Sequence, residues 1–122
     1  MKKLVEILLD DLGSKSKEVT VLLTTDLELR ELNRSFRGKD KATDVLSFPS
    51  EGSYLGDLAI SVQTARRQAK EFQVSLQEEL IRLIIHGILH LHGYDHEAVS
   101  KSEAAKMRRL EKKYFELALS LL

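Results

Sequence analysis

The sequence predicts a fold of the α/β (α+β) class, in which a small mixed sheet of three to four strands is covered by about five helices. Apolar residues alternate between helical spacing and short β-branched runs, in the order helix, strand, helix, strand, strand, helix, helix, helix. The chain has 122 residues without a repeat or low-complexity stretch. This length suits one compact domain spanning residues 1–122.

The N-terminal part of the chain predicts a helix followed by a strand. Leucines recur at helical spacing over residues 2–12, and Gly13 is the residue type that often follows the end of a helix. Acidic residues interrupt this apolar run, so we expect a helix here and not an export signal. Residues 18–25 are apolar and rich in β-branched side chains, which suits a buried strand.

A second helix and a hairpin should follow. Thr25 and Glu28 have the spacing of a capping box, and Gly38 should end the helix that they begin. Residues 44–48 and 55–61 are apolar and are separated by a polar loop, so we expect them to pair as a hairpin. The buried side of the helix should hold Leu29, Leu32 and Phe36.

Three more helices should complete the chain. The first spans residues 62–72. Ser75 and Glu78 cap the next, whose apolar residues cover so much of its circumference that it should lie in the core. The last begins at about Lys101. The expected core positions are Val62, Ala65, Ala69 and Phe72, then Leu76, Leu80, Ile81, Ile84, Ile85, Ile88 and Leu89, and finally Ala104, Met107, Leu110, Tyr114 and Leu117.

The composition limits the possible partners. Nineteen basic residues balance nineteen acidic ones, so contact with a polyanion must be local, and we expect no DNA partner. No stretch approaches the roughly 18 apolar residues of a membrane span, so we expect no membrane partner. The chain has no cysteine, which agrees with a reducing cytoplasm and limits any zinc site to histidine and carboxylate ligands.

All four histidines lie within residues 86–96, which read HGILHLHGYDH. His86 and His90 are four residues apart, so on a helix they lie on one face and suit a shared metal ion. Gly93 can adopt the left-handed conformation that ends a helix and reverses the chain. This reversal would return His96 to the same metal site.

The spacing of these three histidines matches that of metzincin zinc proteases, but Gly87 stands where their catalytic glutamate lies. Three imidazole ligands leave one position of a tetrahedral Zn²⁺ open, so we expect one catalytic Zn²⁺ per chain at the end of the core helix. His92 points away from the pair and is not expected to be a ligand. Each histidine taken alone would more often be a hydrogen-bonded core residue. Asp95 suits either a hydrogen bond to a ligand imidazole or an ordinary turn.

A second informative stretch spans residues 33–49 and reads NRSFRGKDKATDVLSFP. It places a local basic cluster in a neutral chain, and such a run is most often a solvated loop. The functional alternative is that Arg37 offers its planar guanidinium to two oxygens of a phosphate. The basic residues of this cluster are Arg34, Arg37, Lys39 and Lys41.

Together the two stretches resemble the YbeY family, bacterial metal-dependent endoribonucleases that mature ribosomal RNA. The family block H-G-x-L-H-L-x-G-Y-D-H stands here as HGILHLHGYDH, and the block L-N-x-x-F-R-x-x-D-x-P-T-D-V-L-S-F-P as LNRSFRGKDKATDVLSFP. The likeness runs from about Leu32 to Glu111, and it includes LGDLAIS and, in the last helix, Met107 with Glu111. Two long blocks at the right distance form a specific signal.

The resemblance implies a zinc site and a role for Arg37 in catalysis. The zinc ligands that it implies are His86, His90 and His96. Ala42 departs from the family pattern, which usually has proline there. Family members usually begin with an additional strand, so the sheet here is expected to have three strands and an edge that needs cover or a partner.

By this resemblance, the predicted function is zinc-dependent hydrolysis of single-stranded ribosomal RNA in the cytoplasm, notably at the 3′ end of the small-subunit RNA, with a role in ribosome quality control. Few basic anchors and no evident stacking platform suggest that ribosomal proteins and assembly factors deliver the RNA. Two alternatives remain open. One is a zinc peptidase, which Gly87 opposes. The other is a non-catalytic ribosome-assembly factor whose metal only holds the loop around His96 in place.

Overall fold

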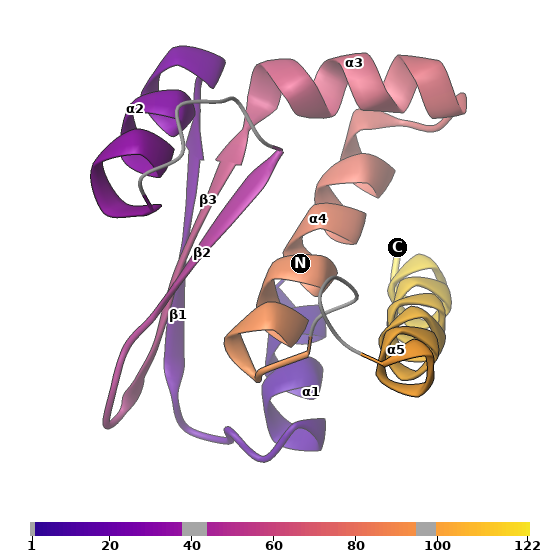
Figure 1. Cartoon of the computed structure of the whole chain (residues 1–122). Helices are drawn as coiled ribbons and strands as arrows, with labels where there is room; N and C mark the ends of the chain where they lie inside the picture. The colour runs from indigo at the N-terminus through magenta and orange to yellow at the C-terminus, as the bar shows by residue number, and fades with distance from the viewer. Residues whose placement is uncertain (1, 38–43, 95–99) are drawn as a thin grey trace.

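The computed structural model describes residues 2–37, 44–94 and 100–122. Three strands form one mixed sheet and five helices surround it, which confirms the predicted fold class (Figure 1). The elements in chain order are α1 (Lys2–Asp11), β1 (Glu18–Thr24), α2 (Asp26–Arg37), β2 (Val45–Pro49), β3 (Tyr54–Ser61), α3 (Val62–Phe72), α4 (Leu76–Leu91) and α5 (Lys101–Ser120).

The sheet has the strand order β1-β3-β2. The expected hairpin is confirmed, because β2 pairs antiparallel with β3, and β1 pairs parallel with the other side of β3. The expectation that residues 18–25 form a buried strand is wrong. β1 lies at the edge of the sheet, and its Leu22 and Leu23 are 47% and 52% exposed. A strand that pairs on one side only is open to solvent at its other edge, whatever its sequence.

Helices cover both faces of the sheet. In Figure 1, α4 runs beside one face and α5 lies on the side of α4 away from the sheet, whereas α2 covers the opposite face. The main core lies between the sheet, α1, α4 and α5, and includes Leu58, Ile60 and Ile88, each fully buried. A smaller core lies under α2 and contains Leu29, Leu46 and Ala59.

Local signals placed the helix ends correctly. The Ser75 hydroxyl accepts a hydrogen bond from the backbone N–H of Glu78, and Thr25 does the same for Glu28. The Glu28 carboxylate bonds the Thr24 hydroxyl and does not reach back to the cap residue. Gly13 has a φ of 83° just after α1, as expected. Among the described helices, none combines the length and the apolar character needed to cross a membrane.

Two aromatic residues that were expected in the core are exposed. Phe36 is 70% exposed on the last turn of α2, where its ring meets Phe48 edge-on at a centroid distance of 5.7 Å. Phe72 is 52% exposed on the last turn of α3, beneath the guanidinium of Arg82. Helical spacing predicted on which side of its helix each ring lies. Because both rings lie on last turns, the elements that cover this side of the helix do not extend over them.

Candidate functional site

Helix α4 brings His86 and His90 together on one face. Their ring centroids are 4.5 Å apart at an interplanar angle of 63°, and the two Nε2 atoms lie 2.9 Å apart. The rest of α4 is packed into the main core, so the helix that carries the pair is held by buried residues such as Ile85 and Leu89. Both rings are partly exposed, which leaves this face accessible.

Glu111 of α5 orients the first of these rings. Its Oε2 lies 3.1 Å from Nδ1 of His86, and the two side chains are 21% and 18% exposed. When Nδ1 donates its proton to this carboxylate, the lone pair of the neutral imidazole lies on Nε2, which faces His90. A carboxylate behind a histidine in this way is the usual outer partner of a metal-binding imidazole. Sequence reasoning assigned no role to Glu111, because the residue lies 25 positions away on another helix.

The geometry of the pair fits a zinc ion. Tetrahedral zinc with Zn–N distances of about 2.0–2.1 Å holds two nitrogens about 3.3 Å apart, so the two Nε2 atoms would need only a small rotation of the rings. Within residues 2–37, 44–94 and 100–122, no three histidine, cysteine or carboxylate side chains gather as a complete ligand set. The third predicted ligand, His96, lies outside the described residues, as does Asp95.

Gly93 ends α4 as predicted. Its φ is 87°, and its N–H bonds the carbonyl of His90 while the N–H of Tyr94 bonds that of Leu89. These bonds satisfy the last carbonyls of the helix and turn the chain back immediately after the histidine pair. The turn on which the proposed return of His96 depends is therefore present, although the position of His96 itself stays a prediction.

His92 has a different environment from the pair. Its Nδ1 lies 2.8 Å from the carbonyl oxygen of Ile88, and its Nε2 lies 2.7 Å from the hydroxyl of Ser14 in the turn after α1. Nδ1–H donates to the carbonyl, so Nε2 accepts from the buried Ser14 hydroxyl. Both ring nitrogens are thus engaged in joining α4 to the α1–β1 turn.

Gly87 lies where α4 approaches the sheet most closely. A Cβ atom at Gly87 would come within 2.7 Å of Leu58 Cδ2 and 3.0 Å of Leu58 Cδ1. The Gly87 carbonyl accepts a hydrogen bond of 3.4 Å from the Ser47 hydroxyl. A side chain larger than hydrogen would have to displace the fully buried Leu58. The glutamate that metzincin proteases carry next to the first histidine has no space here.

Arg82 lies one helical turn before His86 and has a buried partner. Glu79 is 1% exposed, and its two carboxylate oxygens bond Nε and Nη2 of Arg82 at 2.8 and 2.6 Å. These bonds raise the pKa of the Arg82 guanidinium above its ordinary value. The pairing was missed from the sequence, although a Glu and an Arg three residues apart in an otherwise apolar helix could have indicated it.

Arg37 is the last residue of α2, and its side chain lies outside the described residues, as do Lys39 and Lys41. Arg34 of the same cluster and Arg67 of α3 are each paired with a carboxylate. Arg34 bonds Glu31 on the same helix, and Arg67 bonds Asp26 at 2.9 Å. The predicted role of Arg37 therefore stays a prediction.

Comparison with known proteins gives a consistent result. The sequence model of one family, described as Endoribonuclease YbeY, matches residues 1–118. A protein of that name from Aquifex aeolicus is 52% identical over 116 residues, covering 91% of this chain and 77% of the relative. Another from Persephonella marina is 46% identical over 123 residues, covering 95% and 80%. A solution structure of a Thermotoga maritima protein is similar with a TM-score of 0.68 and 36% identity, over 94% of this chain and 76% of that one.

Proposed function

Because the chain belongs to the endoribonuclease YbeY family, whose members are hydrolytic nucleases, we propose that it is a zinc-dependent endoribonuclease that cleaves single-stranded RNA. The single observation that carries the metal-dependent part is the convergence of two Nε2 atoms, one of them on a ring held from behind by Glu111. This arrangement is expected of a pair of metal ligands and not of two independent core histidines.

We propose that His86, His90 and His96 hold one Zn²⁺ per chain. When bound, the ion would supply Lewis-acid chemistry and acidify water at neutral pH. Glu111 favours the tautomer of His86 whose lone pair lies on Nε2, the atom that faces His90. The left-handed turn at Gly93 ends α4 directly after the pair, which supports the proposal that the chain returns His96 to the same site.

Binding of the RNA requires groups beside the histidines. Arg37 would contact the phosphate next to the cleaved bond and stabilise the negative charge that develops there. Phe36 precedes it on the same turn of α2, and its 70% exposed ring, steadied by Phe48, offers a surface on which an unpaired base can stack. The sequence alone suggested no stacking platform, and the exposed ring of Phe36 is the observation that supports one.

The peptidase alternative has less support than the nuclease. Proteases with this histidine spacing carry a glutamate beside the first histidine, and a Cβ atom at Gly87 would come within 2.7 Å of the Leu58 side chain and have to displace it. With no glutamate there, a water molecule that attacks a peptide bond would lack the general base of that protease class.

We further propose that the natural substrate is ribosomal RNA, notably the 3′ end of the small-subunit RNA, processed in the cytoplasm during ribosome maturation and quality control. Equal numbers of acidic and basic residues give the whole chain little general affinity for RNA. Ribosomal proteins and assembly factors would therefore deliver the substrate.

The test is elemental analysis of rigorously purified protein, combined with cleavage of a defined RNA that has single-stranded and duplex parts. We expect one zinc per chain and cuts in the single-stranded part. Arg37→Ala should lower turnover by about 10²-fold at unchanged zinc content, and Arg37→Lys should restore it only in part.

Arg34→Ala is the matched control, since Arg34 lies one turn earlier on α2 and is paired with Glu31. It should leave turnover within about threefold of the wild type. Zinc-loaded protein that never cuts RNA would contradict the proposal and support the assembly-factor alternative, whereas digestion of casein in place of RNA would support the peptidase.

A further inference from the structure

The first two-thirds of α5 carries a dense set of positive charges. Six of the nineteen basic residues of the chain lie within residues 101–113, and all six side chains are exposed. The only exposed acidic residue of this segment is Glu103, since Glu111 is turned toward His86. The six basic residues are Lys101, Lys106, Arg108, Arg109, Lys112 and Lys113. We call these six the basic face of α5.

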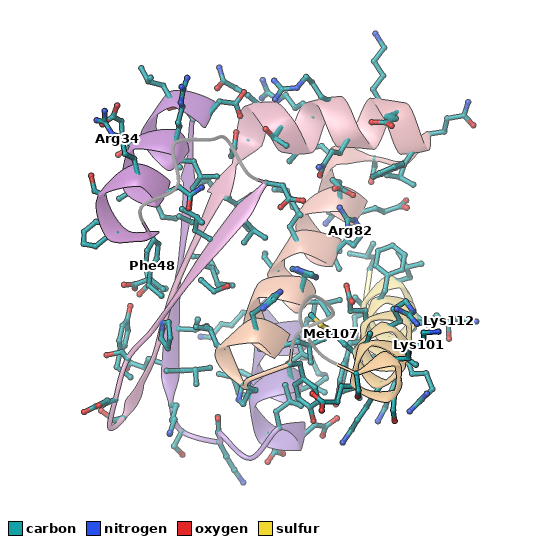
Figure 2. All side chains as sticks on the ribbon, viewed as in Figure 1. Arg34, Phe48, Arg82, Lys101, Met107 and Lys112 are labelled. Atoms are coloured by element: carbon teal, nitrogen blue, oxygen red, sulfur yellow. The ribbon has the colours of Figure 1, made fainter. Side chains whose placement is uncertain are left out.

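The basic face lies opposite the side of α5 that packs on the core. Met107 and Tyr114 are buried, and Figure 2 shows Met107 on the side toward α4, with Lys101 and Lys112 on the outer side. At about 100° per residue, the six charged positions cluster around the direction opposite these buried residues. The positive charges therefore form one continuous strip along the outside of the helix.

Within the part of the chain that the structure describes, none of the six residues forms an ion pair with a carboxylate, and only two have ring contacts, Lys106 over Tyr94 and Lys113 over Tyr114. Arg34, Arg67 and Arg82, by contrast, each bond a carboxylate. The basic face of α5 is therefore a better site for an external anion than these three arginines.

The arrangement of these charges destabilises helix α5. The positive end of the helix dipole is at the N-terminus, where Lys101 stands, while the last turn has no basic residue. Arg108 with Lys112 and Arg109 with Lys113 are like-charge pairs four residues apart, which repel each other. A helix selected only for stability would mix acidic and basic residues here, so the strip is better explained by a ligand with many negative charges.

The strip borders the histidine site. Glu111, whose carboxylate is 3.1 Å from His86, belongs to the same turns of α5, and Arg108 is its neighbour three residues away on the helix surface. We infer that the basic face of α5 binds the phosphate backbone of the RNA on one side of the cleaved bond. This inference rests on the proposed function for the identity of the polyanion and adds a surface that the sequence did not single out.

The test compares two variants with the same change of net charge. In the first, Lys101, Arg108, Arg109 and Lys112 are replaced by glutamine; in the control, Lys2, Lys3, Lys15 and Lys17, all exposed and remote from α5 in the sequence, are replaced by glutamine. Binding of a 2′-O-methylated single-stranded RNA, which cannot be cleaved through its 2′-hydroxyl, is followed by fluorescence anisotropy from 50 to 200 mM salt.

We expect the α5 variant to bind at least about 10-fold more weakly at 100 mM salt, with a salt slope smaller by about 3, because each phosphate contact on a single strand contributes about 0.7. The control should change both values little. The melting temperature of the α5 variant should stay the same or rise by a few degrees, since glutamine favours a helix and the repulsion is removed.

Equal affinity and equal salt slope in the two variants would overturn the inference. The same result is expected if the basic face of α5 binds an acidic protein and not RNA. Binding of the methylated RNA does not depend on turnover. A wild-type protein that binds it through α5 but cleaves no RNA would therefore contradict the proposed function and leave the inference standing.

Discussion

Two environments within seven residues of α4 and its end give histidines different roles. At His86 and His90, the Nε2 atoms face each other at 2.9 Å, and the remaining nitrogen of His86 is held by a carboxylate. At His92, one nitrogen bonds the Ile88 carbonyl and the other bonds the Ser14 hydroxyl. The contrast lies in the partner: Nε2 of His86 meets a second imidazole nitrogen with which it could share a metal ion, whereas the nitrogens of His92 meet a backbone carbonyl and a hydroxyl.

The helix explains why neighbours differ so much. His86 and His90 project from the face that α5 approaches, whereas His92 is about 200° around from His90 and meets the turn after α1. A histidine on one side of α4 therefore meets a carboxylate, and a histidine on another side meets a hydroxyl. Four predictions test how far these two environments differ.

The largest effect is expected for His90→Ala. Removing one imidazole from the proposed three-histidine site should weaken zinc binding by about 10²- to 10³-fold, measured by competition with a chelator, because each ligand carries a large share of the binding free energy. His92→Ala is the matched control and should retain the wild-type affinity. Loss of zinc from His92→Ala but not from His90→Ala would reverse the assignment of the two environments.

A smaller effect is expected for Glu111→Gln, which keeps the shape of the side chain and removes its charge. Zinc affinity should fall by about 10-fold, as is typical when the outer partner of a ligand histidine is lost. The nitrogen shifts of the His86 ring in zinc-free protein should also move toward a mixture of tautomers, a change that a purely structural role would not produce. Unchanged nitrogen shifts would show that Glu111 does not orient this ring.

The structural role of His92 predicts a change of stability without loss of metal. His92→Ala leaves the Ser14 hydroxyl buried without its ring partner, so the free energy of unfolding in urea should fall by about 1 kcal/mol. Ser14→Ala should cost a similar amount, and the double variant should cost less than the sum of the two. Strict additivity would mean that the bond contributes nothing to stability.

The smallest effect concerns a polar cluster that involves neither kind of histidine. Hydrogen bonds from Ser61 and Thr64, together with Arg67, lower the pKa of Asp26 to about 2. Because the folded pKa lies below that of the unfolded chain, the stabilisation is present above about pH 4 and is lost as the pH falls toward 2. The cluster is partly solvated, so its contribution should be below about 1 kcal/mol.

Asp26→Asn should flatten this part of the dependence of the unfolding free energy on pH, and it should leave zinc affinity unchanged. The measurement is a set of urea titrations between pH 5 and pH 2 on zinc-free protein. An identical slope in wild type and variant would show that Asp26 titrates alike in the folded and unfolded chain.

Much of the fold followed from local patterns. The serine cap of α4 and the glycines after α1 and α4 were predictable because each signal acts within a few residues, through a side chain on a nearby N–H or a positive φ. The stacking of His86 on His90 was predictable for the same reason, since residues four apart on a helix must be neighbours. The histidine spacing alone also separated His92 from the pair.

Contacts between distant segments could not be predicted in this way. The partner of His92 lies 78 residues away at Ser14, and the partner of His86 lies 25 residues away at Glu111. The exposure of Phe36 and of the β1 leucines depended on where the covering layer stops, which helical or strand periodicity does not encode.

Residue spacing along single segments was enough to predict the family, the helices and strands, and the helix face on which a metal could bind. Only the folded chain shows which carboxylates lie beside His86 and Arg67, and why a side chain at position 87 would have to displace Leu58. Those three properties arise where separate elements meet. At His86 and Gly87, the packing of α4 against Leu58 and of α5 against α4 brings the relevant atoms within contact distance.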